Sequence, residues 1–175
     1  MSRSAAPLLA VAAALVLTAC HDVDTKRIPL MPVRIPFATV GDWHTYGVGG
    51  AAMAVSFIRV NGGTHGTPAG YPYTGLTATG FGGVLLVGTF TYSGDPLLTP
   101  PAAFDLACPV EARADIRIAP DYKESCARCS TCGSTYDIFQ ATGMPLSGPA
   151  AKLGYGLKSY RVAAGGSSGY LLITN

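Results

Sequence analysis

The sequence predicts an all-β domain with the character of a sandwich or barrel. Short β-branched and aromatic runs separated by Gly, Pro, Ser or Asn, typical of such folds, occur at 54–60, 82–92, 102–110, 115–120, 134–140, 157–162 and 170–175. The 22 glycines, 13 prolines and nine tyrosines among 175 residues also favour short strands joined by tight turns. No window of about 11–18 residues keeps the apolar spacing of an amphipathic helix.

Residues 1–19 are predicted to be a bacterial lipoprotein signal peptide. Arg3 precedes an uncharged apolar run over 7–17, which is too short to span a bilayer and is typical of a secretory signal. The run ends in Leu-Thr-Ala-Cys20, which resembles the lipobox where signal peptidase cuts before the cysteine. We therefore expect acyl chains on Cys20 to anchor the chain to a membrane, in the extracytoplasmic cell envelope. The alternative is an ordinary signal peptide that happens to be followed by a cysteine.

Residues 20–38 are expected to form an extended tether ahead of a single domain over 39–175. Prolines at 29, 32 and 36 favour an extended backbone, and at about 3.1 Å per residue the tether would hold the domain some 40–50 Å from the bilayer. Loss of residues 1–19 removes only Arg3, so the net charge falls from +2 to +1. This near-neutral charge argues against nucleic acid as a partner and against a basic patch for anionic lipid.

The histidines carry no local catalytic motif. His21 adjoins the expected anchor, while His44 and His65 stand in "GDWHTYG" and "GGTHGTP", where turn or surface positions are expected. No local pattern supports a Ser-His-Asp or Cys-His arrangement. Enzyme activity is therefore less expected than electron transfer or binding.

Four cysteines remain after Cys20, namely Cys108, Cys126, Cys129 and Cys132. An exported protein lives in an oxidising compartment, so two disulfides are one interpretation. However, Cys129 and Cys132 have the two-residue spacing and trailing glycine of a metal knuckle. A second knuckle is missing, so the spacing alone leaves both interpretations open.

The segment from Phe104 to Val162 resembles a Rieske iron–sulfur domain. The family's first box reads C-x-H and its second C-x-x-H-G-S-x-Y. In "CSTCGSTYD" the second box is matched by Cys129, Gly133, Ser134 and Tyr136, and "GPA" at 148–150 matches the family's proline loop. The resemblance implies a Rieske-like antiparallel sandwich whose small cluster-binding subdomain, about 104–154, is inserted between the parts of a base domain.

The sequence departs from this family at the histidine ligands. Val110 occupies the first histidine position and Cys132 the second, whereas a Rieske cluster holds one iron with two cysteines and the other with two histidines. A histidine-ligated cluster is therefore not expected. Ser134 and Tyr136 resemble the family's hydrogen-bond donors to the cluster and to a ligand sulfur.

Three functions remain open. The first is a degenerate, metal-free Rieske-like module that binds an unidentified envelope protein or helps an assembly. The second is an electron-transfer protein with an all-cysteine 2Fe-2S centre, and the third is a structural zinc site. Both metal sites would use Cys108, Cys126, Cys129 and Cys132.

Overall fold

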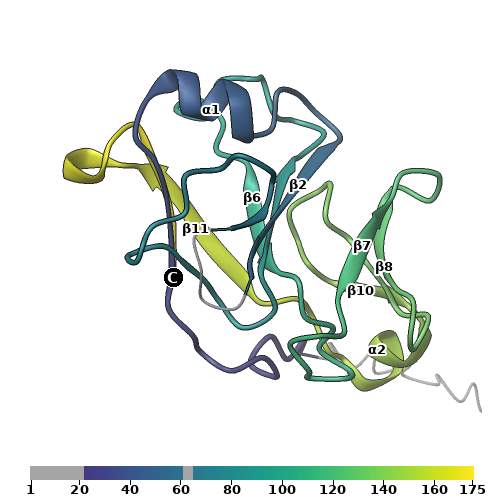
Figure 1. Ribbon diagram of the computed structural model, residues 1–175. Helices are drawn as coiled ribbons and strands as arrows, with labels where there is room; N and C mark the ends of the chain where they lie inside the picture. The colour runs from purple at the N-terminus through teal and green to yellow at the C-terminus, as the bar shows by residue number, and fades with distance from the viewer. Residues whose placement is uncertain (1–21, 61–64) are drawn as a thin grey trace, which may run out of the picture.

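The computed structural model describes residues 22–60 and 65–175, so the predicted signal peptide and Cys20 lie outside the described residues. The chain is mostly β, with two antiparallel sheets and only short helices (Figure 1). The prediction of an all-β fold is thereby confirmed. Each of the seven predicted runs overlaps a strand. Over the described ranges, none of the helices has the length and apolar character needed to cross a membrane.

The larger sheet contains eight strands. Their order is β3 (Gly66–Thr67), β2 (Met53–Arg59), β5 (Val84–Gly88), β6 (Ala102–Asp105), β11 (Ser159–Ala164), β12 (Leu171–Thr174), β1 (Val33–Phe37) and β4 (Ala78–Thr79). At one edge β4 approaches β2 near the opposite edge, and Nη1 of Arg59 donates to the carbonyl of Thr77 at 2.7 Å. The sheet therefore curls towards a closed barrel.

Aromatic side chains fill the inside of this sheet. Phe37 makes edge-to-face contacts with Trp43, Phe57 and Tyr71, with ring centroids 5.0–6.0 Å apart. Trp43 comes from α1 (Val40–Tyr46), a seven-residue helix that begins with a capping box between the Thr39 and Asp42 side chains. Each such aromatic pair contributes about 0.5–1.5 kcal/mol beyond burial of its area, so the core fixes α1 despite its short length.

Residues 33–37 differ from the extended tether expected over 20–38. They form β1, which pairs with β12 and β4 and buries Val33, Ile35 and Phe37. This alternation buries every second side chain, as in a strand with one face on the core. Asp24 also bonds to the domain, because its N–H donates to the Gly154 carbonyl at 2.7 Å. The chain is thus attached to the domain well before residue 39.

A smaller four-stranded sheet is formed by the chain between β6 and β11, two strands that pair with each other in the larger sheet. Its order is β10 (Pro145–Ser147), β9 (Thr135–Tyr136), β8 (Cys126–Cys129) and β7 (Ile118–Asp121), and α2 (Gly148–Leu153) follows it. In Figure 1 it stands beside the larger sheet. Leu85 and Phe104 of the larger sheet share a buried cluster with Tyr136 and Ile138, so apolar packing joins the two sheets.

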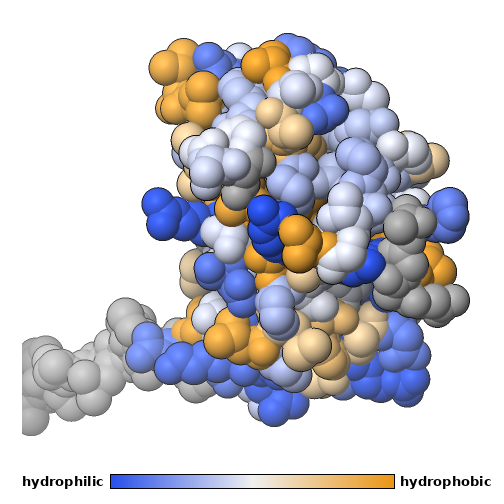
Figure 2. All heavy atoms as spheres, turned by 60° about the vertical axis from the view of Figure 1, so that its left-hand side comes forward, coloured by the Kyte–Doolittle hydropathy of each residue, from blue (hydrophilic) through white to orange (hydrophobic). Residues whose placement is uncertain are grey.

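Figure 2 shows one face of the molecule, on which apolar side chains form several small separate patches among polar ones. Exposed large apolar residues such as Leu30, Leu76 and Leu98 come from segments far apart in the sequence. Single exposed apolar side chains are ordinary on protein surfaces.

Candidate metal centre

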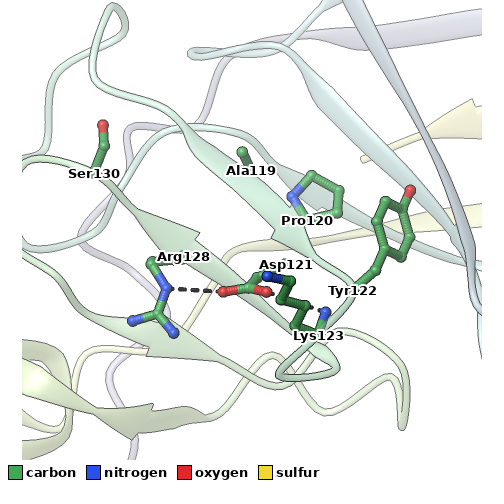
Figure 3. A pocket seen from close by; sticks show the side chains of 7 residues that line it. All are labelled: Ala119, Pro120, Asp121, Tyr122, Lys123, Arg128 and Ser130. Carbon is green, nitrogen blue, oxygen red and sulfur yellow. Dashed lines mark hydrogen bonds and ion pairs between the residues drawn. The ribbon is translucent and has the colours of Figure 1, made fainter.

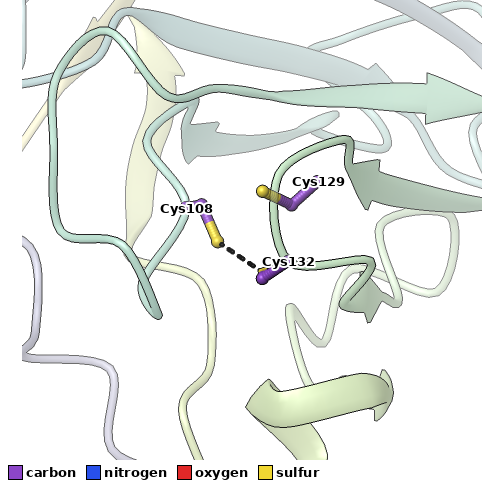
Figure 4. Close-up of side chains that lie close together, drawn as sticks. All are labelled: Cys108, Cys129 and Cys132. Atoms are coloured by element: carbon purple, nitrogen blue, oxygen red, sulfur yellow. Dashed lines mark hydrogen bonds between the residues drawn. The ribbon is translucent and has the colours of Figure 1, made fainter.

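Three of the four cysteines meet in one group. The sulfur atoms of Cys108, Cys129 and Cys132 all lie within 4.8 Å of one another, and those of Cys108 and Cys132 are 3.6 Å apart (Figure 4). Cys108 and Cys129 are fully buried, while Cys132 is half-buried. Protein therefore surrounds the group around Cys108 and Cys129, and solvent reaches it beside Cys132.

Backbone pairing brings the cysteine-bearing segments together. The chain after β6 runs beside the approach to β7, with the Cys108 N–H donating to the Ile116 carbonyl at 2.9 Å. Ile118 at the start of β7 is in turn the register partner of Cys129 at the end of β8. A tight turn then returns the chain, since the Gly133 N–H donates to the Cys129 carbonyl at 2.9 Å and Gly133 has φ +72°. This turn places Cys132 over Cys108.

The structure does not bring Cys126 into this group. Cys126 and Cys129 both belong to β8 and are three positions apart. Because strand side chains alternate between faces, an odd separation points them to opposite faces of the sheet. Cys126 instead lines a separate hollow with Arg128 and Thr135, and burial raises the pKa of its thiol. Of the four expected ligands, the structure therefore groups three and leaves Cys126 as a separate buried thiol.

The two predicted hydroxyl residues contact the sulfurs. The Tyr136 hydroxyl lies 3.4 Å from the Cys108 sulfur, and the Ser134 hydroxyl oxygen lies 3.2 Å from the Cys132 sulfur and also accepts the Ala150 N–H at 3.0 Å. Burial, reinforced by Cys108, raises the pKa of the Tyr136 hydroxyl. Tyr136 therefore keeps its proton and can donate to a thiolate.

The surroundings shift the pKa values of the Cys108 and Cys132 thiols in opposite directions. Burial raises the pKa of the Cys108 thiol to about 12. Burial also acts to raise the pKa of Cys132, but contacts with Ser134 and with the other two cysteines outweigh it, so its pKa lies below the usual value. A metal ion that took both sulfurs would have to displace a proton at least from Cys108.

A histidine-ligated Rieske cluster does not fit this site. Val110, at the first histidine position, offers no donor atom and packs against the buried cluster between the sheets. Neither His44 nor His65, both exposed, belongs to the sulfur group. The three cysteines could hold a metal ion, and soft thiolate ligands suit Zn²⁺, Cu⁺ and iron–sulfur clusters.

Asp105 is a residue that the sequence analysis missed. Its fully buried carboxylate accepts the N–H groups of Phe81, Gly82 and Ala107 and the Tyr160 hydroxyl, at 2.6–3.3 Å. It thereby ties the larger sheet to the segment that carries Cys108. An acidic residue in the middle of the apolar run "AAFDLAC" was the available signal, since a buried charge needs hydrogen-bond partners.

We expect Gly148→Ala to destabilise the protein by about 2–3 kcal/mol, because it adds a clash to the strain of a left-handed backbone. Gly148 has φ +75°, and a Cβ there would lie 2.8 Å from Cα of Ser134. Gly166→Ala is the matched control, since Gly166 has φ +53° with nothing within 4 Å, and should cost only about 1 kcal/mol. Urea denaturation measures both. Equal losses of unfolding free energy in the two variants would show that the close packing of Gly148 against Ser134 is unimportant.

A shallow groove of about 450 Å³ lies along the β7–β8 hairpin, away from the sulfur group (Figure 3). Asp121 and Arg128 form an ion pair in it with a nitrogen–oxygen distance of 3.0 Å. The pair holds the pKa of Asp121 below its usual value. None of the three grouped cysteines lines the groove, so it is not part of the candidate metal centre.

Fold and site together define a mostly β protein with a buried three-cysteine group. No protein-family model, curated protein or solved structure matches the chain. The functional argument therefore depends on the site itself.

Proposed function

We propose that the protein binds one soft metal ion through Cys108, Cys129 and Cys132, as a lipid-anchored protein of the bacterial cell envelope. The observation that supports this proposal is the approach of three sulfur atoms to within 4.8 Å of one another. The ion would take three thiolates from the protein. Ser134 and Tyr136 would donate hydrogen bonds to two of the sulfurs.

The sulfur spacing suits one ion. Three sulfurs in tetrahedral directions at a Zn–S distance of about 2.3 Å lie about 3.8 Å from one another. Cys108 and Cys132 are already 3.6 Å apart. Two irons with bridging sulfides need more room and four protein ligands, and Cys126 faces away. Both features favour a mononuclear site over the all-cysteine 2Fe-2S centre.

The three-ligand set also favours ion exchange over a purely structural role. Structural zinc sites are closed by four protein ligands, whereas sites with three keep one position for water or an incoming group. Here Cys132 is the only one of the three cysteines that is partly exposed, so an incoming group would reach the ion beside it. An incoming ligand could therefore take the ion by exchange, which suits a protein that stores or transfers a metal.

We further propose that residues of about 104–154 form a Rieske-like subdomain that has exchanged its histidine ligands for this site. The placement of the smaller sheet between the paired strands β6 and β11 supports this proposal. Binding to an envelope protein or assembly, the metal-free alternative, stays a prediction.

The anchor would hold the domain close to the bilayer. Asp24 is bonded to the carbonyl of Gly154, and its own carbonyl accepts the Gly156 N–H at 3.0 Å. Cys20 precedes Asp24 by four positions, so at about 3.5 Å per residue the two lie no more than about 14 Å apart. A lipidated Cys20 would therefore keep the domain at the membrane surface, in place of the 40–50 Å reach expected for a longer tether.

Zinc titration of the reduced full chain in detergent tests the proposal. We expect one equivalent of Zn²⁺ to bind in competition with a chromophoric chelator. Changing Cys108, Cys129 or Cys132 to Ser should weaken binding by more than about 100-fold, since loss of even an outer hydrogen-bond partner costs about 10–100-fold.

Cys126→Ser is the matched control for this titration. It removes a buried thiol from the same sheet and is expected to leave zinc affinity within about threefold, because Cys126 lies on the opposite face of β8. A loss for Cys126→Ser as large as that for Cys129→Ser would restore the four-cysteine site and contradict the proposal.

A further inference from the structure

We infer that Cys108 and Cys132 form a reversible disulfide, through which the site exchanges two electrons with another disulfide. The inference uses the same three cysteines as the proposed function but does not depend on metal binding. It states that Cys108 and Cys132, of the three sulfurs, undergo thiol–disulfide exchange.

The distance between the two sulfurs supports the bond. The sulfurs of Cys108 and Cys132 are 3.6 Å apart, and a disulfide joins them at about 2.05 Å. Both residues stand outside the strands, Cys108 after the end of β6 and Cys132 in the turn between β8 and β9. Side-chain rotation with a small shift of that turn can close the remaining gap without breaking a strand ladder.

Cys129 is less suited to either end of this bond. It is the last residue of β8 and is paired with Ile118 of β7, so a shift of its backbone would disturb the strand pairing. Its side chain is also fully buried, whereas Cys132 is half-buried. Cys132 is therefore the sulfur that an incoming reagent reaches first, and Cys108 is the resolving thiol beside it.

The reaction is an ordinary thiol–disulfide exchange. The Cys132 thiolate attacks one sulfur of a disulfide RS–SR, whose S–S bond breaks, releasing RS⁻ and leaving a mixed disulfide on Cys132. The Cys108 thiolate then attacks the Cys132 sulfur and releases the second RS⁻. The two protons of the protein thiols end on the two RS⁻ groups, so the protein is oxidised by two electrons and RS–SR becomes two RSH.

Oxidation would remove two of the three metal ligands at once. The remaining thiol, Cys129, is buried and cannot hold an ion alone. Metal and disulfide therefore exclude one another, and in an oxidising compartment the bound ion would protect the thiols until it leaves. Reduction of the bond would restore the three-sulfur group.

Tryptic mapping of the metal-free full chain tests the inference. The protein is equilibrated with oxidised glutathione, its remaining thiols are alkylated, and it is digested. The positions of Lys and Arg place Cys108 in peptide 60–113, Cys126 in peptide 124–128, and Cys129 with Cys132 in peptide 129–152. We expect 60–113 to be joined to 129–152 and lighter by two hydrogen atoms than the separate peptides together.

Two variants identify which cysteine of peptide 129–152 forms the disulfide with Cys108. The joined pair should persist in Cys129→Ser, where Cys132 is the only thiol left in its peptide, and should disappear in Cys132→Ser. Persistence in Cys132→Ser, a loop closed within 129–152, or no joined pair in a Cys129→Ser protein with native near-UV circular dichroism would overturn the inference. Because no metal is present, failure of zinc binding leaves this result unaffected, and the converse also holds.

Discussion

Asp105→Ala is expected to lower the free energy of unfolding by about 3–5 kcal/mol, because several buried donors lose their acceptor at once and each unsatisfied donor costs about 1–3 kcal/mol. The carboxylate is fully buried and accepts from the Ala107 N–H at 2.7 Å and the Tyr160 hydroxyl at 2.6 Å. Urea denaturation should show a lower midpoint with an unchanged slope.

Tyr160→Phe is the control for this prediction. It removes a single donor and leaves the carboxylate bonded to backbone N–H groups, so a loss of only about 1–2 kcal/mol is expected. Asp105→Ala should also weaken zinc binding, because Asp105 accepts from the Ala107 N–H and Ala107 adjoins Cys108. If Asp105→Ala cost less than 1 kcal/mol, the described role of Asp105 in joining the sheet to the cysteine segment would be wrong.

Zinc is expected to stabilise the reduced protein by about 4 kcal/mol when the free ion is at 1,000 times its dissociation constant, provided that the unfolded chain does not bind it. The physical reason is that folding gathers Cys108, Cys129 and Cys132, which come from two segments of the chain. Thermal unfolding with and without zinc measures the shift, and excess chelator should reverse it.

Cys132→Ser tests the origin of that shift. The variant keeps the two fully buried ligands, Cys108 and Cys129, but loses the third, so zinc should no longer raise its midpoint of unfolding. Cys126→Ser should respond to zinc as the unaltered protein does. A zinc-induced shift that survives in Cys132→Ser would place the ion elsewhere.

Strand-forming runs were the part of the fold that sequence could predict. β-Branched runs such as "VLLV" at 84–87 became buried strands, because local composition and burial agree there. Residues 33–37 were harder, since prolines at 32 and 36 favour an extended chain without requiring a sheet partner. The pairing of β1 with β12 joins residues more than 130 positions apart, and no local pattern reveals such a contact.

The candidate site was predictable in its residues but not in its grouping. The spacing of Cys129 and Cys132 indicated a metal knuckle, and the resemblance to a second Rieske box singled out Ser134 and Tyr136. The position of Cys126 depended on where β8 begins, because its parity relative to Cys129 decides which face it occupies. The spacing in the sequence gives the odd separation, but it does not show that one strand spans both cysteines.

X-ray absorption at the zinc edge of the zinc-loaded full chain tests the three-thiolate site most directly. We expect three sulfur neighbours at about 2.3 Å and one nitrogen or oxygen neighbour at about 2.0–2.1 Å, as for an ion with one open position. The sulfurs would belong to Cys108, Cys129 and Cys132, and Cys126→Ser should leave the spectrum unchanged. Four sulfur neighbours, or fewer than three, would contradict the proposed centre.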